Sequence, residues 1–153
     1  MKIWVDADAC PNPVKAIVFR AAERRAVETV LVANHHQRVP PSRYLSTLQV
    51  PAGFDMADHA IVSRMSGGDL VVTGDVPLAA EVVRQGGTGL NPRGTLYTVE
   101  NIHDHLASRD LMQGLRDQGL VAGGTGTLSK PELQAFANQL DRFLTTWRPD
   151  EGV

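Results

Sequence analysis

The chain has 153 residues, of which 42% are hydrophobic and 21% are charged, with a formal net charge of −2. This length suits one domain with its own core, and the near-neutral charge neither favours nor excludes a nucleic-acid partner. No apolar run approaches the roughly 20 residues that a membrane helix needs, and the first residues lack the pattern of a signal peptide. We therefore expect a single cytoplasmic domain over 1–153 with no membrane contact and, with one cysteine, no internal disulfide.

The N-terminal part predicts a buried strand that ends in acids and is followed by a helix. Residues 3–5 form a short apolar strand, and Asp6 and Asp8 come directly after it. Asn12 stands before a proline, which predicts a helix N-cap at Asn12 and a helix over about 13–25.

The rest of the chain continues to alternate strands with helices. In chain order we expect a strand at 29–33, a short strand at 48–50, a helix at about 56–65, a strand at 70–73, a helix at about 77–85, a brief strand at 88–91 and a helix at about 99–117 that Gly119 ends. A Gly/Thr-rich loop at 122–128 then precedes a capping box at Ser129 and Glu132, which opens a helix over about 130–147. This alternation predicts an α/β fold, a three-layer α/β/α arrangement around a central, mainly parallel sheet.

Acidic residues are concentrated at the predicted strand ends. Asp6 and Asp8 follow the first strand, and Asp75 follows the strand at 70–73. Ligands of parallel sheets bind at the carboxyl ends of the strands, and an extended backbone would turn Asp6 and Asp8 to the same side. Because clustered carboxylates repel one another and Mg²⁺ and Mn²⁺ prefer oxygen ligands, these acids predict a divalent-metal site suited to phosphodiester hydrolysis.

Each of the acids also has a purely structural interpretation. Asp75 and Asp55 both stand where they could cap the helix that follows. Asp8 could bind amides of its own loop, and Asp58 could be a solvated residue on a helix face. Asp69 has the position of a turn residue before a strand.

Three other reactive side chains are expected to stay outside the chemistry. The adjacent His35 and His36 point to different sides and cannot share one ion, so we expect solvent exposure or a substrate contact. Cys10 stands beside carboxylates that would raise the pKa of its thiol, and we expect it to be a packed small residue.

Four motifs resemble those of a known family: 5–11 (VDADACP), 53–58 (GFDMAD), 68–75 (GDLVVTGD) and 91–94 (NPRG). Together they resemble the YaiI/YqxD family of PIN-like proteins over nearly the whole chain. PIN domains are metal-dependent ribonucleases. The resemblance therefore implies a PIN-like fold and a Mg²⁺- or Mn²⁺-dependent nuclease that hydrolyses RNA or other single-stranded nucleic acid with water as the nucleophile. It also suggests a homodimer.

The resemblance assigns roles to particular residues. Asp6, Asp58 and Asp75 match the acids of PIN domains, and Asp8 is an additional acid of this family. The hypothesis gives all four, Asp6, Asp8, Asp58 and Asp75, as catalytic metal ligands. The candidate substrate contacts in this hypothesis are Lys15, Asn34, Arg38, Arg43, Thr73 and Arg93. The chain departs from the expected family pattern at 123–127 and 132–133, so the C-terminal loop receives no substrate role.

Two other functions stay open. Asp6 and Asp8 in the spacing Asp-x-Asp also resemble the nucleophile and general acid of haloacid-dehalogenase-type phosphatases, although that class needs a lysine and a hydroxyl after later strands and the chain has few lysines. The second alternative is a non-catalytic module that binds RNA or a protein partner, with structural acids.

Overall fold

One six-stranded sheet forms the centre of the computed structural model, which describes residues 1–119 and 127–147. The strands lie in the order β3-β2-β1-β4-β5-β6. Their bounds are Ile3–Asp6 (β1), Thr29–Ala33 (β2), Leu45–Gln49 (β3), Leu70–Val72 (β4), Thr88–Leu90 (β5) and Leu96–Tyr97 (β6). Only β6 runs antiparallel to its neighbour, which confirms the predicted α/β fold with a mainly parallel sheet.

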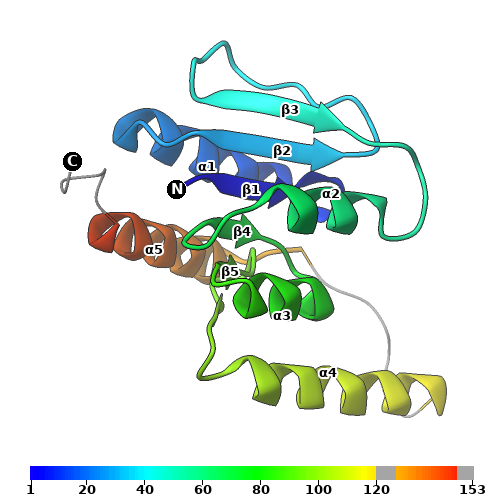
Figure 1. Ribbon diagram of the computed structural model, residues 1–153. Coiled ribbons are helices and arrows are strands. Elements are labelled where there is room, and N and C mark those ends of the chain that lie inside the picture. The colour runs from blue at the N-terminus through cyan, green and yellow to red at the C-terminus, as the bar shows by residue number, and fades with distance from the viewer. Residues whose placement is uncertain (120–126, 148–153) are drawn as a thin grey trace.

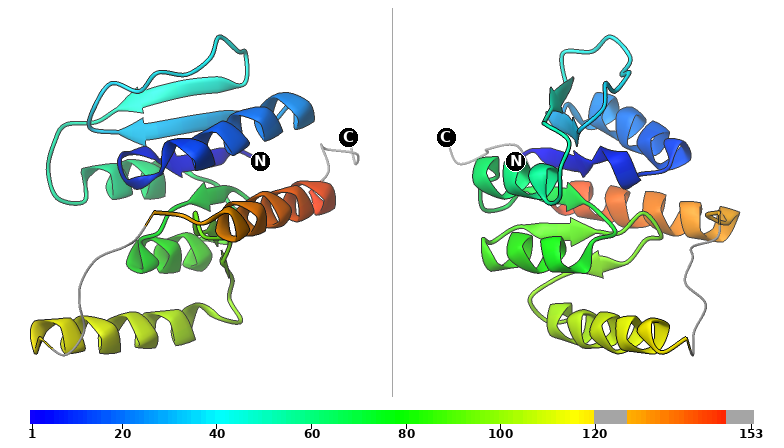
Figure 2. Two further views of the ribbon diagram at one scale, coloured as in Figure 1. Left: turned by 180° about the vertical axis from the view of Figure 1, so that it is seen from behind. Right: turned by 90° about the vertical axis from the view of Figure 1, so that its right-hand side faces the viewer.

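Helices cover both faces of this sheet. They are Asn12–Arg25 (α1), Met56–Arg64 (α2), Val76–Arg84 (α3), Ile102–Asp117 (α4) and Lys130–Thr146 (α5), with a short 3₁₀ helix at Ala7–Ala9 (η1). Helices α1 and α5 lie together on one face, and α2 and α3 lie on the other (Figures 1 and 2). Helix α4 packs outside α3.

The core explains why the central strands are apolar on both faces. Ile3 and Val5 point toward α1 and α5, where Phe136 is fully buried. Trp4, between them in the chain, points to the opposite face and packs with Ile61 of α2. A strand with helices on both sides has no solvent-facing residues, so it shows a continuous apolar run in place of alternation.

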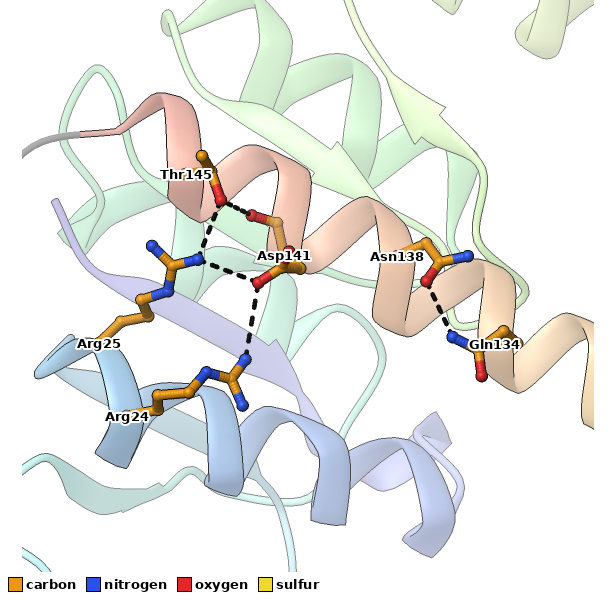
Figure 3. A network of polar contacts seen from close by, with 6 residues as sticks. All are labelled: Arg24, Arg25, Gln134, Asn138, Asp141 and Thr145. Carbon is orange, nitrogen blue, oxygen red and sulfur yellow. Dashed lines mark hydrogen bonds and ion pairs between the residues drawn. The ribbon is translucent and has the colours of Figure 1, made fainter.

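Polar contacts stabilise the start of α5 and link this helix to α1. The predicted capping box is confirmed: the Ser129 hydroxyl accepts the N–H of Glu132, and the Glu132 carboxylate accepts the N–H of Ser129. Farther along α5, Asp141 accepts a hydrogen bond from Arg25 at 3.0 Å and lies 3.7 Å from Arg24 (Figure 3). These ion pairs are exposed and contribute at most about 1 kcal/mol, so apolar burial holds α5 in place.

The order of the strands creates a switch point between β1 and β4. From β1 the chain moves outward through β2 to β3, returns to β4 beside β1, and then moves outward the other way. Ile3 pairs with Leu70 and Val5 with Val72, so the two strands end side by side. Open parallel sheets bind ligands at such a point, and Asp6 and the segment after β4 lie there.

Several element boundaries differ from the sequence-based expectation. Strand β3 spans Leu45–Gln49 where 48–50 was expected, and β6 was not predicted. Asn12 lies inside α1, because Pro11 occupies the N-cap position with an extended backbone. Gly119 has a φ of +74° just after α4 and ends the helix as predicted.

Two further expectations concern the loops and the membrane. The predicted loop at 122–128 falls mostly on 120–126, which lie outside the described residues. Within the described part of the chain, no helix is long and apolar enough to cross a membrane.

Candidate acidic site at the carboxyl edge of the sheet

Asp6 and the end of β4 are joined by one hydroxyl group. The Thr73 hydroxyl donates to the Asp6 carboxylate (Oγ1 to Oδ2, 2.9 Å) and accepts the backbone N–H of Asp75 at 3.0 Å. Thr73 is only 1% exposed. Its side chain therefore orients Asp6 and the turn that carries Asp75, and it is occupied by these contacts instead of facing a substrate.

Three carboxylates from distant parts of the chain act on one another here. Burial raises the pKa of Asp6, although the hydrogen bond from Thr73 opposes the shift, and the charges of Asp75 and Asp8 raise it further. Burial also raises the pKa of Asp58 on α2 to about 6, and the charges of Asp75 and Asp6 add to this effect. We call Asp6, Asp58 and Asp75 the acidic cluster.

Asp75 has a structural role in addition to its place in the acidic cluster. It is the N-cap of α3, and its Oδ1 atom accepts the N–H of Leu78 at 3.0 Å. The predicted cap is therefore present, and it holds the carboxylate at the start of a helix, where the helix dipole favours a negative charge. Asp55 also occupies an N-cap position, before α2, but its side chain makes no capping hydrogen bond.

The backbone between Asp6 and Asp8 is not extended, so that expectation was wrong. Residues Ala7–Ala9 form a 3₁₀ helix, and residues two apart in such a turn face different sides. The Asp8 carboxylate accepts the N–H of Asn34 at 2.7 Å, and its other oxygen lies 3.4 Å from Nδ1 of His35. Asp8 thus fastens the loop after β2, and the amide it binds comes from that loop instead of its own.

The fit of a divalent cation depends on the oxygen donors and their spacing. Within residues 1–119 and 127–147, no three histidine, cysteine or acidic side chains form a group that could hold a metal ion as it stands. Mg²⁺ usually keeps several waters and takes only one or two protein carboxylates directly. The acidic cluster supplies hard carboxylate oxygen donors, so the donor chemistry fits Mg²⁺ or Mn²⁺ through one or two direct ligands.

A groove of about 440 Å³ opens beside the acidic cluster, between α2, α3 and α4. Asp58 and Asp75 line it together with apolar side chains of α2 and α3, among them Val62 and Leu78. Sequence reasoning missed four further lining residues, which are Phe54, His59, Glu81 and Arg109. The sequence could have indicated Phe54 and His59, because they lie next to acids of the 53–58 motif. Glu81 and Arg109 join the groove only through the packing of α3 and α4.

Three predicted substrate contacts, Lys15, Asn34 and Arg38, lie in or beside the loop after β2. Lys15 donates to the side-chain oxygen of Gln37 at 2.9 Å, which holds the loop after β2 against α1. The side-chain oxygen of Asn34 is buried without a hydrogen-bond partner in the described part of the structure. Arg38 is exposed in the same loop.

Arg93 lies at a second hollow of about 420 Å³, which Gly74 and Asn91 also line. Its guanidinium contacts the Glu132 carboxylate at 2.5 Å, and its backbone N–H donates to the side chain of Asn91. The backbone N–H of Ser129 and the contact with Arg93 lower the pKa of Glu132. Arg93 therefore helps to seat the first turn of α5.

Arg43 lies far from the acidic cluster. Leu45, the first residue of β3, pairs with Thr29, the first residue of β2, and the N–H of Thr29 donates to the carbonyl of Tyr44. Arg43 is therefore at the amino edge of the sheet, opposite the edge that carries Asp6. The parallel crossover between β2 and β3 carries the chain across the full height of the sheet, so the start and end of the loop face opposite edges.

Cys10 and Asp69 have structural roles. Cys10 is 6% exposed, and burial is the main reason why its pKa rises to about 12, with Asp6 contributing less. It is packed as predicted. Asp69 is more than a turn residue: its buried carboxylate accepts the backbone N–H groups of Lys2 and Ser66 and the indole N–H of Trp4.

The fold and site define an α/β protein with acids at the switch point of a mainly parallel sheet. The model of the family described as Uncharacterized BCR, YaiI/YqxD family matches residues 4–146. The chain belongs to this family, as the resemblance of its motifs indicated.

Curated relatives cover almost the whole chain. A UPF0178 protein of Halorhodospira halophila is 57% identical over 152 residues, which are 99% of this chain and 100% of the relative. UPF0178 proteins of Shewanella sediminis and Pseudoalteromonas translucida are 56% and 59% identical, over 96% and 94% of this chain and 98% and 96% of their own lengths. No solved structure matches the chain.

Proposed function

We propose that the protein is a Mg²⁺- or Mn²⁺-dependent nuclease that hydrolyses phosphodiesters of RNA or other single-stranded nucleic acid. The observation that carries the proposal is the acidic cluster: β1, α2 and the segment after β4 each bring one carboxylate to the switch point, where burial and, to a smaller extent, the charges of Asp75 and Asp6 raise the pKa of Asp58 to about 6. A protein gains no stability from bringing like charges together. A cation would relieve this repulsion.

Each residue of the site would have its own role in this activity. Asp58 and Asp75 line the groove, and Asp6 lies at the end of β1 beside them. Thr73 orients Asp6, and Asp8 holds the loop after β2. A bound Mg²⁺ or Mn²⁺ would polarise the phosphoryl group and lower the pKa of a water molecule. At neutral pH Asp58 is mostly ionised and ready to bind.

The phosphatase alternative has less support from the contacts. A nucleophilic Asp6 needs a deprotonated carboxylate and a lysine nearby. Lys15, the one lysine among the predicted site residues, donates to Gln37. The hydroxyl at the end of the neighbouring strand, Thr73, already binds Asp6.

A cleavage assay tests the proposal. The substrate would be a 5′-labelled single-stranded RNA, with Mn²⁺ and with EDTA, and the proteins would be the wild type, Asp58→Asn and a control, Asp104→Asn, at an exposed acid of α4 outside the groove. We expect Mn²⁺-dependent cleavage that falls at least about 100-fold in Asp58→Asn and is unchanged in the control. Cleavage that persists in EDTA, or in Asp58→Asn, would contradict the proposal.

A further inference from the structure

Phe54 is the most exposed of the large hydrophobic residues that the structure describes. Its side chain is 93% exposed, compared with 71% for Val99 and 64% for Leu111. Single exposed apolar residues are common on protein surfaces. Phe54 differs because it borders the groove that also holds Asp58 and Asp75.

The residues on both sides of Phe54 have positive φ angles. Gly53 has a φ of +150° and Asp55 a φ of +62°. A residue with a side chain is uncommon in the left-handed region, although aspartate tolerates it better than most. Asp55 makes no side-chain capping hydrogen bond, but its carbonyl accepts the N–H of His59 at 2.9 Å, so this turn opens α2 and leaves Phe54 exposed just before the helix.

The groove combines features that a nucleotide needs, although four carboxylates also line it and repel a phosphate backbone unless a cation neutralises them. Its volume of about 440 Å³ is in the range of small-ligand sites. Phe54 offers a flat aromatic face, and Val62, Pro77 and Leu78 provide apolar walls. Arg109 supplies a cation from α4; its neighbour Asp110, 3.1 Å away, is an exposed partner that a phosphate can replace.

We propose that Phe54 is a stacking platform for an unpaired base of a single-stranded nucleic acid, whose backbone passes along the groove with Arg109 as a phosphate contact. This inference rests on the proposed function, and it names the substrate as single-stranded, because bases inside a duplex have both faces covered by their neighbours. Every base has an aromatic face, so the platform tolerates any sequence.

Binding of a labelled octauridylate with nuclease-resistant phosphorothioate linkages tests the inference, by fluorescence anisotropy with Mn²⁺ and with EDTA. Replacing the ring by Phe54→Ala is expected to weaken binding roughly 5- to 150-fold, the range for one stacked base. Phe54→Trp retains or strengthens binding. The matched control is Leu111→Ala, which removes an exposed apolar side chain of α4 outside the groove and leaves binding unchanged.

An abasic oligomer of the same length separates stacking from charge attraction. We expect it to bind the wild type and Phe54→Ala equally. Equal binding of octauridylate to these two proteins would overturn the inference, and so would an equal loss for the abasic oligomer. A wild type that binds no oligomer, but whose self-association in sedimentation depends on Phe54, would also overturn it and make the turn a protein interface.

The inference and the proposed function can fail separately. Cleavage by the wild type with no effect of Phe54→Ala on octauridylate binding would overturn the stacking platform and leave the nuclease in place. Octauridylate binding that depends on Phe54, in a protein that cleaves no RNA, would support the stacking platform and contradict the proposed nuclease activity.

Discussion

Asp58 shows at the scale of one residue how the acidic cluster affects stability. Its pKa is raised from 3.8 to about 6 by burial and by the charges of Asp75 and Asp6. Between these two values the folded protein binds more protons at this site than the unfolded chain does. The contribution of Asp58 to the free energy of unfolding therefore falls as the pH rises through this window, and above it the ionised carboxylate is destabilising.

This sign gives a prediction for Asp58→Asn in the absence of metal. The amide carries no charge, so the variant should be more stable than the wild type at about pH 8, and the difference should shrink toward about pH 4. Urea unfolding at both pH values measures it. The contrary results are an Asp58→Asn variant that is less stable than the wild type at about pH 8, or one whose added stability grows as the pH falls. Either result would show that burial and the neighbouring charges do not destabilise the ionised Asp58 carboxylate.

At the same scale, some residues were predictable and others were not. Asp6 and Asp75 follow from the position of acids directly after apolar runs, and the Asp75 cap follows from the helix after it. The contacts of Asp8 and Asp69 depend on partners at Asn34 and Trp4, far away in the sequence. No local pattern encodes such partners, so a turn role was the natural but incomplete expectation.

At the scale of the element, α3 joins the site to the fold through its N-cap. Asp75 is both a member of the acidic cluster and the residue that accepts the N–H of Leu78. Its two roles can be separated, because asparagine caps a helix about as well as aspartate. Asp75→Ala should lower the free energy of unfolding by about 1 kcal/mol, whereas Asp75→Asn should be close to the wild type or slightly more stable.

Chemical denaturation of both Asp75 variants, with Mn²⁺ absent, checks this difference. Equal destabilisation of the alanine and asparagine variants would mean that charge, and not the cap, determines the contribution of Asp75. Both variants should bind Mn²⁺ more weakly, because neither retains the carboxylate.

The elements themselves were predictable where local chemistry decides them. Strand β2 and the capping box of α5 appear where the apolar run and the Ser129–Glu132 spacing place them. Strand β6 has two residues and is defined by its pairing with β5. Strand β3 is an edge strand with exposed Ser46 and Thr47, so its apolar pattern was too weak to mark its start.

At the scale of the whole molecule, topology determines which residues can meet. The alternation of strands and helices predicted a parallel sheet, but the strand order is set by tertiary packing. That order brings β4 next to β1 and places Asp6, Thr73 and Asp75 together. The same parallel geometry places Arg43 at the opposite edge, which a loop-by-loop interpretation could not foresee.

The central claim is that Asp6, Asp58 and Asp75 together create a site for a divalent cation, with one or two of them as direct ligands. Calorimetric titration of Mn²⁺ into the wild type, the three single Asp→Asn variants and the Asp104→Asn control tests it most directly. We expect micromolar to low-millimolar binding by the wild type and the control, weakened at least about tenfold in each of the three variants. No binding by the wild type, or equal binding by all five proteins, would contradict the account.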